Sequence, residues 1–133
     1  MFSKKFLIVE DDKQISEIIS RICKEEGGEA RSVNEPSLFV PEYAEFKPDI
    51  IILDIIMPEM DGFEIIRYLS ENRSQAKIII LSGQESYRHM AEKMAASLDV
   101  NIVDNIPKPF RIANVRHTIQ SLSDQKPYKT ATA

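Results

Sequence analysis

The sequence predicts an α/β fold in which helices cover both faces of a parallel sheet. Three short apolar runs are continuous and do not alternate with polar residues, as in strands buried on both sides: Phe6–Val9, Ile50–Leu53 and Ile78–Leu81. The stretches between these runs carry apolar residues three and four apart, a spacing typical of amphipathic helices. This alternation favours a doubly wound parallel sheet with right-handed crossovers.

The first helix is expected between Asp12, which can cap its start, and Gly27-Gly28, which can end it. Its apolar stripe consists of Ile15, Ile18, Ile19, Ile22 and Cys23. A weaker strand is expected at Ala30–Val33. The second helix should cover residues 36–46, but Pro41 lies inside it, so we expect a short, kinked or partly unwound element.

The later elements follow the same alternation. The third helix should begin after Asp61-Gly62, and a weak strand is expected at Val100–Ile106. Pro107 cannot donate to a ladder, which indicates an edge strand or the end of a strand. The apolar residues expected to face the core from the last three helices are Phe63, Ile66 and Leu69, then Tyr87, Met90, Ala91, Met94, Ala95 and Leu98, then Ile112, Val115, Ile119 and Leu122.

Length and composition set limits on the class of protein. The 133 residues fit one domain, predicted at residues 1–123, and residues 124–133 lose all periodicity, as in a tail or the start of a linker. A net charge of −4 and an isoelectric point near 5.2 argue against direct nucleic-acid binding. No apolar run approaches the roughly 18 residues of a membrane span, and the N-terminus does not resemble a secretory signal. The single cysteine, Cys23, is expected in the core and fits a reducing cytoplasm.

Polar residues follow the predicted strands at the point where each strand ends. They are Glu10, Asp11 and Asp12, then Asp54, then Ser82 and Gly83, then Lys108 and Pro109. In a parallel sheet ligands bind beyond the carboxyl ends of the strands, so these side chains should converge. Two carboxylates about 4 Å apart repel by about 4 kcal/mol at an effective dielectric near 20. Oxygen donors without histidine or cysteine favour Mg²⁺ as the compensating cation.

Each of these residues alone has an ordinary explanation, as a helix cap, a turn residue or part of a solvated loop. Their joint occurrence at four strand ends, each with a residue suited to phosphoryl transfer, favours one shared site instead. His89 and His117 lie within helical patterns and are interpreted as surface or packing residues.

On these motifs the sequence resembles response-regulator receiver domains, over about residues 4–123. The motifs are Phe6–Asp12, Ile52–Gly62, Leu81–Gly83 and Pro107–Phe110. The resemblance implies a flavodoxin-like, doubly wound (βα)₅ three-layer sandwich with strand order 2-1-3-4-5. It also implies a phosphoacceptor signalling domain, not an enzyme in the ordinary sense, which assists its own phosphorylation and dephosphorylation.

The resemblance assigns a metal site to four residues. Asp54 would be the phosphoacceptor. Asp11 and Asp54 would ligate Mg²⁺ together with the backbone carbonyl of Ile56, and Glu10 would act through water.

Three further positions would complete the phosphoryl site. Ser82 would hydrogen-bond the phosphoryl group, Lys108 would pair with it, and Gly83 would leave room for it to enter. The resemblance also implies a cis peptide bond between Lys108 and Pro109.

The implied partners are a sensor histidine kinase or phosphotransfer protein, whose phosphohistidine donates the group, and a downstream output domain or protein, all in the cytoplasm. The chain departs from the family pattern at Asn105, where an aromatic residue is usual, and in its longer segment over residues 96–105. It would be either a stand-alone receiver or the N-terminal part of a larger regulator.

Two other functions remain to be weighed. A Mg²⁺-dependent phosphohydrolase with an aspartyl nucleophile would carry a second acid two residues after Asp54, where this chain has Ile56. An interaction module that is never phosphorylated would not need the complete set of acids, hydroxyl and lysine.

Overall fold

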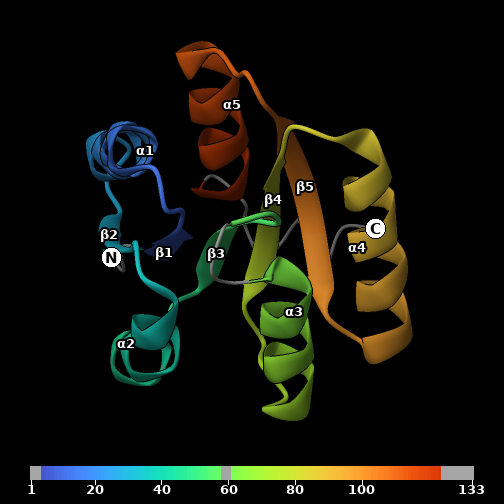
Figure 1. Cartoon of the computed structure of the whole chain (residues 1–133). Coiled ribbons are helices and arrows are strands. Elements are labelled where there is room, and N and C mark those ends of the chain that lie inside the picture. Colours follow the sequence, from blue (N-terminus) through green and yellow to red (C-terminus); the bar gives the residue numbers. More distant parts are fainter. Residues whose placement is uncertain (1–3, 58–60, 124–133) are drawn as a thin grey trace, which may run out of the picture.

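A five-stranded parallel sheet forms the centre of the computed structural model, which describes residues 4–57 and 61–123 (Figure 1). Its spatial order is β2-β1-β3-β4-β5, which confirms the expected order. The strands are β1 (Lys5–Val9), β2 (Glu29–Val33), β3 (Ile50–Asp54), β4 (Lys77–Ser82) and β5 (Asn101–Pro107). The central strands β1, β3 and β4 are the three continuous apolar runs, and the two weaker runs form the edges.

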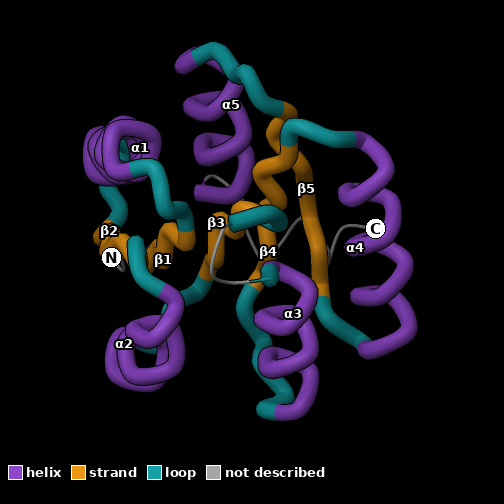
Figure 2. The backbone as a smooth tube through the Cα atoms, in the orientation of Figure 1, coloured by secondary structure: helices purple, strands orange, loops and turns teal. Residues whose placement is uncertain are grey.

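Helices cover both faces of the sheet, as Figure 2 shows. On one face α1 and α5 pack against Ile8, Ile52 and Ile79, and on the other α2, α3 and α4 pack against Leu7, Leu53 and Ile80. The strand residues alternate between these two cores because successive side chains of a strand point to opposite faces. The helices are α1 (Lys13–Glu25), α2 (Phe39–Phe46), α3 (Gly62–Glu71), α4 (Glu85–Leu98) and α5 (Ile112–Ser123).

The first helix begins and ends as its sequence predicts, and the second is the expected short, partly unwound element, with its α-helical part beginning at Phe39 instead of residue 36. The Asp12 carboxylate accepts hydrogen bonds from two backbone N–H groups of the first turn of α1, and Gly27 follows the helix with φ +92°. Residues 36–38 form a single 3₁₀ turn before α2 begins at Phe39. Pro41 therefore lies in the first turn of α2, where backbone N–H groups have no partner within the helix, and its missing N–H costs no hydrogen bond.

Three residues of the expected apolar stripes are exposed. Ile18 is 36% exposed because it lies at the edge of the α1 stripe, beside the buried Ile19, Ile22 and Cys23. Met90 is 55% exposed because Ala91 and Ala95, the most inward residues of α4, bring the helix close to the sheet and leave Met90 at its side. Ile112 is 52% exposed because it opens α5, one turn before Val115 reaches the sheet. The expected burial of Cys23 is confirmed, and His89 and His117, interpreted as surface or packing residues, are both exposed.

The edge strand β5 ends at Pro107, as its sequence predicts. Its pairing with β4 shifts by one residue between Ile78 and Ile79, so that Val103 is an extra residue in the ladder. Just beyond this irregularity, the backbone N–H of Asn105 donates to the Asp104 carboxylate at 2.8 Å. Among the described residues no helix is long and apolar enough to span a membrane. The expected tail at 124–133 lies outside the described residues.

Candidate functional site

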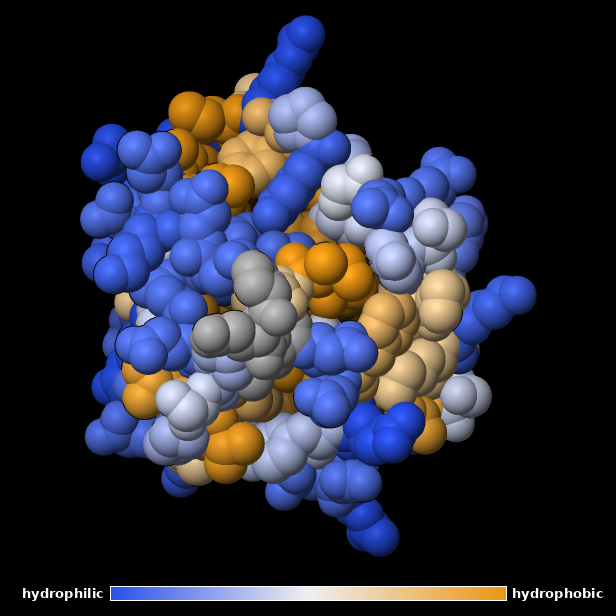
Figure 3. Space-filling view, viewed as in Figure 1, coloured by the Kyte–Doolittle hydropathy of each residue, from blue (hydrophilic) through white to orange (hydrophobic). Residues whose placement is uncertain are grey.

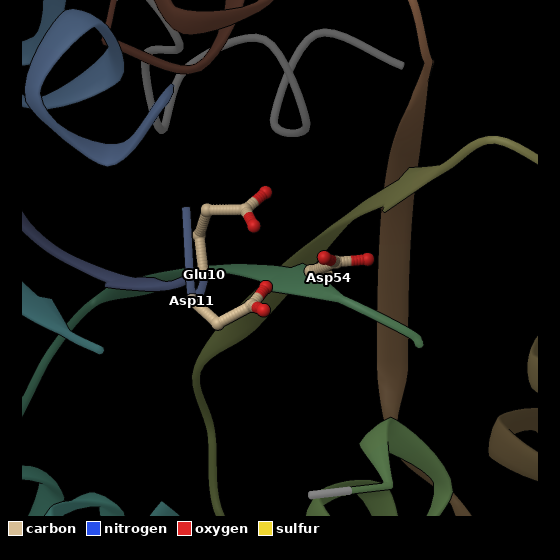
Figure 4. A group of neighbouring side chains, drawn as sticks. All are labelled: Glu10, Asp11 and Asp54. Atoms are coloured by element: carbon tan, nitrogen blue, oxygen red, sulfur yellow. The ribbon is translucent and has the colours of Figure 1, made fainter. Parts of the chain in front are cut away.

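Three carboxylates meet at the carboxyl end of β1 and β3. Oxygen atoms of Glu10, Asp11 and Asp54 all lie within 4.8 Å of one another (Figure 4). The pairing of Val9 with Leu53 explains this, because it brings the ends of the two adjacent strands to the same level. Glu10 and Asp54 are 1% and 5% exposed, whereas Asp11 is exposed to solvent.

Lys108 crosses from the end of β5 to this acidic group. Its Nζ lies 2.7 Å from Glu10 Oε1 and donates to Asp54 Oδ2 at 3.1 Å. The lysine therefore neutralises one of three negative charges, and the group keeps a net charge of −2 when all three acids are ionised. A divalent cation matches that remaining charge.

Burial has a large effect on the acid–base properties of Glu10. It raises the pKa of that carboxyl from 4.5 to about 7, against the opposing effects of Lys108 and of a hydrogen bond from the Asp12 N–H. Burial lowers the pKa of Lys108, but its contacts with Glu10 and Asp54 outweigh this effect and leave the pKa above its ordinary 10.5. The lysine is thus charged at neutral pH.

Backbone groups and one side chain not anticipated from the sequence support the acids. Asn34 Nδ2 donates to the Glu10 carbonyl at 2.7 Å and to Ser16 Oγ at 3.1 Å. The Ile56 N–H donates to Asp54 Oδ1 at 3.3 Å. Asn34 directly follows β2, so the rule that found the other residues, a polar side chain at a strand end, would have found it too.

The Ser82 hydroxyl is engaged within its own loop. It donates to the Gln84 carbonyl at 2.8 Å and accepts from the Gln84 N–H at 3.1 Å. Beside this loop an open cavity of about 410 Å³ is lined by Ser82, Lys108, Arg88 and the half-buried Asn105. The small amide at position 105 leaves this space between α4 and β5 open.

The site has room beside Gly83, where an added Cβ would meet only Lys108 Cβ, at 3.9 Å. The peptide bond between Lys108 and Pro109 is cis, as the resemblance implied. The structure thus brings together the predicted Glu10, Asp11 and Asp54 with Lys108, and it places Ser82 and Gly83 at the adjacent strand end.

A doubly wound sheet of this order, with acids after β1 and β3 and a lysine after β5, defines a signalling domain of the receiver class. The model of the response regulator receiver domain family matches residues 6–120, and the chain belongs to this family.

Named relatives and solved structures agree with this assignment. The response regulator MprA of Mycobacterium leprae is 28% identical over 118 residues, which are 89% of this chain and 50% of that protein. A response regulator of Colwellia psychrerythraea has a TM-score of 0.81 at 32% identity, with 94% of this chain and 100% of that one covered. A CheY-like receiver domain protein of Methanospirillum hungatei has the same fold, with a TM-score of 0.78 at 22% identity and coverage of 92% and 95%. The chain spans about half the length of the curated relatives it matches.

Proposed function

We propose that Asp54 accepts a phosphoryl group from the phosphohistidine of a sensor histidine kinase or phosphotransfer protein. The observation that supports this most is the placement of Asp54 at a strand end, within 4.8 Å of two other acids and in contact with Lys108. A buried aspartate used only for structure would not need such a concentration of like charge, which is costly in a protein interior.

The proposed reaction is a nucleophilic attack by the Asp54 carboxylate on the phosphoryl group. One carboxylate oxygen attacks phosphorus, the bond between phosphorus and the donor's imidazole nitrogen breaks, and the nitrogen keeps the electron pair. Asp54 Oδ1 is oriented by the Ile56 N–H, and Oδ2 contacts Lys108. The protein's contribution is positioning and charge neutralisation, as in other phosphoryl transfers.

The donor set fits magnesium, because it consists of carboxylate oxygens without histidine or cysteine. Asp11, Asp54 and the Ile56 carbonyl would hold the ion, with Glu10 acting through water. Bound Mg²⁺ supplies positive charge next to the phosphoryl oxygens.

Two side chains would change partners on phosphorylation. Lys108 would follow the negative charge from the Asp54 carboxylate to the phosphoryl group. Ser82 would turn its hydroxyl from the Gln84 carbonyl to a phosphoryl oxygen, which frees the first turn of α4, and the open space beside Gly83 admits the group. This change of the α4 entrance would carry the signal to an output domain or partner protein in the cytoplasm, with no direct nucleic-acid contact by this domain.

Intact-mass measurement after incubation with acetyl phosphate and Mg²⁺ tests the proposal. Wild-type protein should gain one phosphoryl group, and neither Asp54→Asn nor a sample with excess chelator should gain it. Asp104→Asn, an exposed carboxylate on β5, is the matched control and should react like wild type. An equal gain in Asp54→Asn would show that another residue is the acceptor.

A further inference from the structure

Two cations line the cavity between α4 and β5, which pack against each other (Figure 1). Lys108 lines it from the end of β5, and Arg88 lines it from the first turn of α4. The walls also include Ser82 and the half-buried Asn105. Because an amide is much smaller than the aromatic ring that is usual at position 105, the space between the two cations stays open. Arg88 therefore faces the same cavity as the hydroxyl and the lysine of the proposed phosphoryl site.

Arg88 is held by two acids of its own helix. Its guanidinium lies 3.1 Å from the Glu92 carboxylate and 3.8 Å from that of Glu85. The Arg88 side chain is only 22% exposed, whereas those of Glu92 and Glu85 are 36% and 76% exposed, and the surface over the start of α4 is hydrophilic (Figure 3, upper right). Ion pairs with exposed acids add little stability because water and salt screen them. Arg88 can therefore exchange these acids for a stronger partner at little cost.

A shared hydrogen-bond acceptor connects Arg88 to Ser82. The Gln84 carbonyl accepts from the Ser82 hydroxyl at 2.8 Å and from the backbone N–H of Arg88 at 3.2 Å. When Ser82 turns its hydroxyl to a phosphoryl oxygen, as proposed above, the Gln84 carbonyl keeps the Arg88 N–H and loses its bond to the end of β4. The first turn of α4, which carries Arg88, is thus directly connected to the group that changes partner.

The balance of charge at the site changes on phosphorylation. When Glu10, Asp11 and Asp54 are all ionised, Lys108 and a divalent cation together neutralise them. Conversion of the Asp54 carboxylate to an acyl phosphate replaces one negative charge with about two, which leaves about one negative charge without a partner. Arg88 is the other cation among the described residues that line the adjoining cavity, so it can supply the missing positive charge.

We propose that Arg88 is a second phosphoryl-binding cation, an inference that rests on the proposed phosphorylation of Asp54. After phosphorylation its guanidinium leaves Glu92, enters the cavity beside Asn105 and donates to a phosphoryl oxygen. A guanidinium suits this role because its N–H donors form a rigid fork that matches the oxygens of a phosphoryl group. Glu92 then loses its partner, so the phosphorylated state presents an unpaired acid on α4 that a downstream protein can recognise.

The probe is beryllofluoride, a mimic of the phosphoryl group, added to the full chain with Mg²⁺ and followed by NMR. Arg88→Gln should bind it about tenfold more weakly than wild type because a charge-assisted hydrogen bond is lost, and Arg88→Lys, which keeps the charge, should recover part of the affinity. The Nε–H signal of Arg88 should shift on binding. Arg67→Gln, at an exposed arginine of α3, is the matched control and should bind like wild type. An Arg88→Gln variant with wild-type affinity would overturn the proposal.

Two further variants distinguish phosphoryl binding from a merely structural ion pair. Glu92→Gln releases Arg88 and should tighten beryllofluoride binding by about threefold, whereas loss of a structural pair would weaken it. Asp99→Asn, at the other end of α4, is the control for the loss of an acid and should have no effect. Asn105→Phe fills the cavity, so in that background Arg88→Gln should change the affinity by less than about twofold. Weaker binding by Glu92→Gln, or an undiminished effect of Arg88→Gln in the Asn105→Phe background, would contradict the proposed movement.

The wild-type protein separates failure of this inference from failure of the proposed function. If it gains a phosphoryl group from acetyl phosphate and binds beryllofluoride, but Arg88→Gln binds equally well, then Asp54 is the acceptor without help from Arg88. If wild type gains no phosphoryl group and binds no beryllofluoride, the proposed function and the role of Arg88 both fail.

Discussion

Gly62, the first residue of α3, packs directly on the backbone of Ile55 and of Asp54, the proposed phosphoacceptor. A Cβ added at this position would lie 2.7 Å from Ile55 Cα, 2.8 Å from the Ile55 carbonyl oxygen and 3.1 Å from the Asp54 carbonyl oxygen. Carbon atoms in ordinary contact are about 3.5–4.0 Å apart, so Gly62→Ala requires the start of α3 or the end of β3 to move by about 1 Å.

The cost of that movement can be worked out from the contacts. Overpacking of a tight interior costs about 1–3 kcal/mol, and weakening the hydrogen bond from the Gly62 N–H to the Ile55 carbonyl, now 2.9 Å, adds about 1 kcal/mol. The greater helix propensity of alanine returns at most about 1 kcal/mol. We therefore expect Gly62→Ala to lower the free energy of unfolding by about 2 kcal/mol and to slow phosphorylation of Asp54.

Urea unfolding measures the first effect. With a slope of about 2 kcal/mol per molar, the midpoint should fall by about 1 M. Gly83→Ala is the matched control, because its added Cβ meets only one atom, at 3.9 Å, and its stability should change by less than about 0.5 kcal/mol. Equal midpoints for the two variants would refute the argument from close approach.

Three further measurements test other parts of the structure. In metal-free protein burial raises the pKa of Glu10 to about 7, so between about pH 4.5 and 7 this carboxyl is protonated in the folded state and ionised in the unfolded state. The free energy of unfolding should therefore fall as the pH rises through this range, by at most about 3 kcal/mol. Urea titrations of Glu10→Gln in chelator should lack this fall, and a fall of equal size in the variant would contradict it. Burial raises the pKa of the Cys23 thiol to about 12, so native protein should resist a thiol reagent at pH 8 that reacts at once in urea; rapid native labelling would disprove this burial. When beryllofluoride binds, amide shifts should concentrate on residues 82–90, because Asn105 has little apolar area to bury; a large shift with burial of Asn105 would oppose this view.

Much of the architecture could be predicted because buried parallel strands produce two recognisable patterns in the sequence. Continuous apolar runs such as Ile50–Leu53 indicate strands covered on both faces, and polar residues such as Asp54 directly after them must share one edge of the sheet. The placement of Glu10 and Asp54 at one edge follows from these two facts, and their contact also requires β1 and β3 to be neighbours, as in the strand order that the family resemblance implied.

Other features depend on distances that a one-dimensional pattern does not contain. Periodicity indicates the side of α4 that faces the sheet but not how wide the contact is, so Met90 was expected in the core and is exposed. The pairing of Lys108 with Glu10 joins β5 to β1, two strands that are not neighbours, and it depends on the reach of the lysine side chain.

The irregular edge of β5 has a consequence for the behaviour of the protein at high concentration. A strand approaching from a neighbouring molecule would find the Asn105 N–H already bound to the Asp104 carboxylate, an extra residue at Val103 that interrupts the register, and a Pro107 with no N–H to offer. Each of these features opposes growth of the sheet from one molecule into the next. The receiver can thus be abundant in solution without its outer strand acting as a template for aggregation.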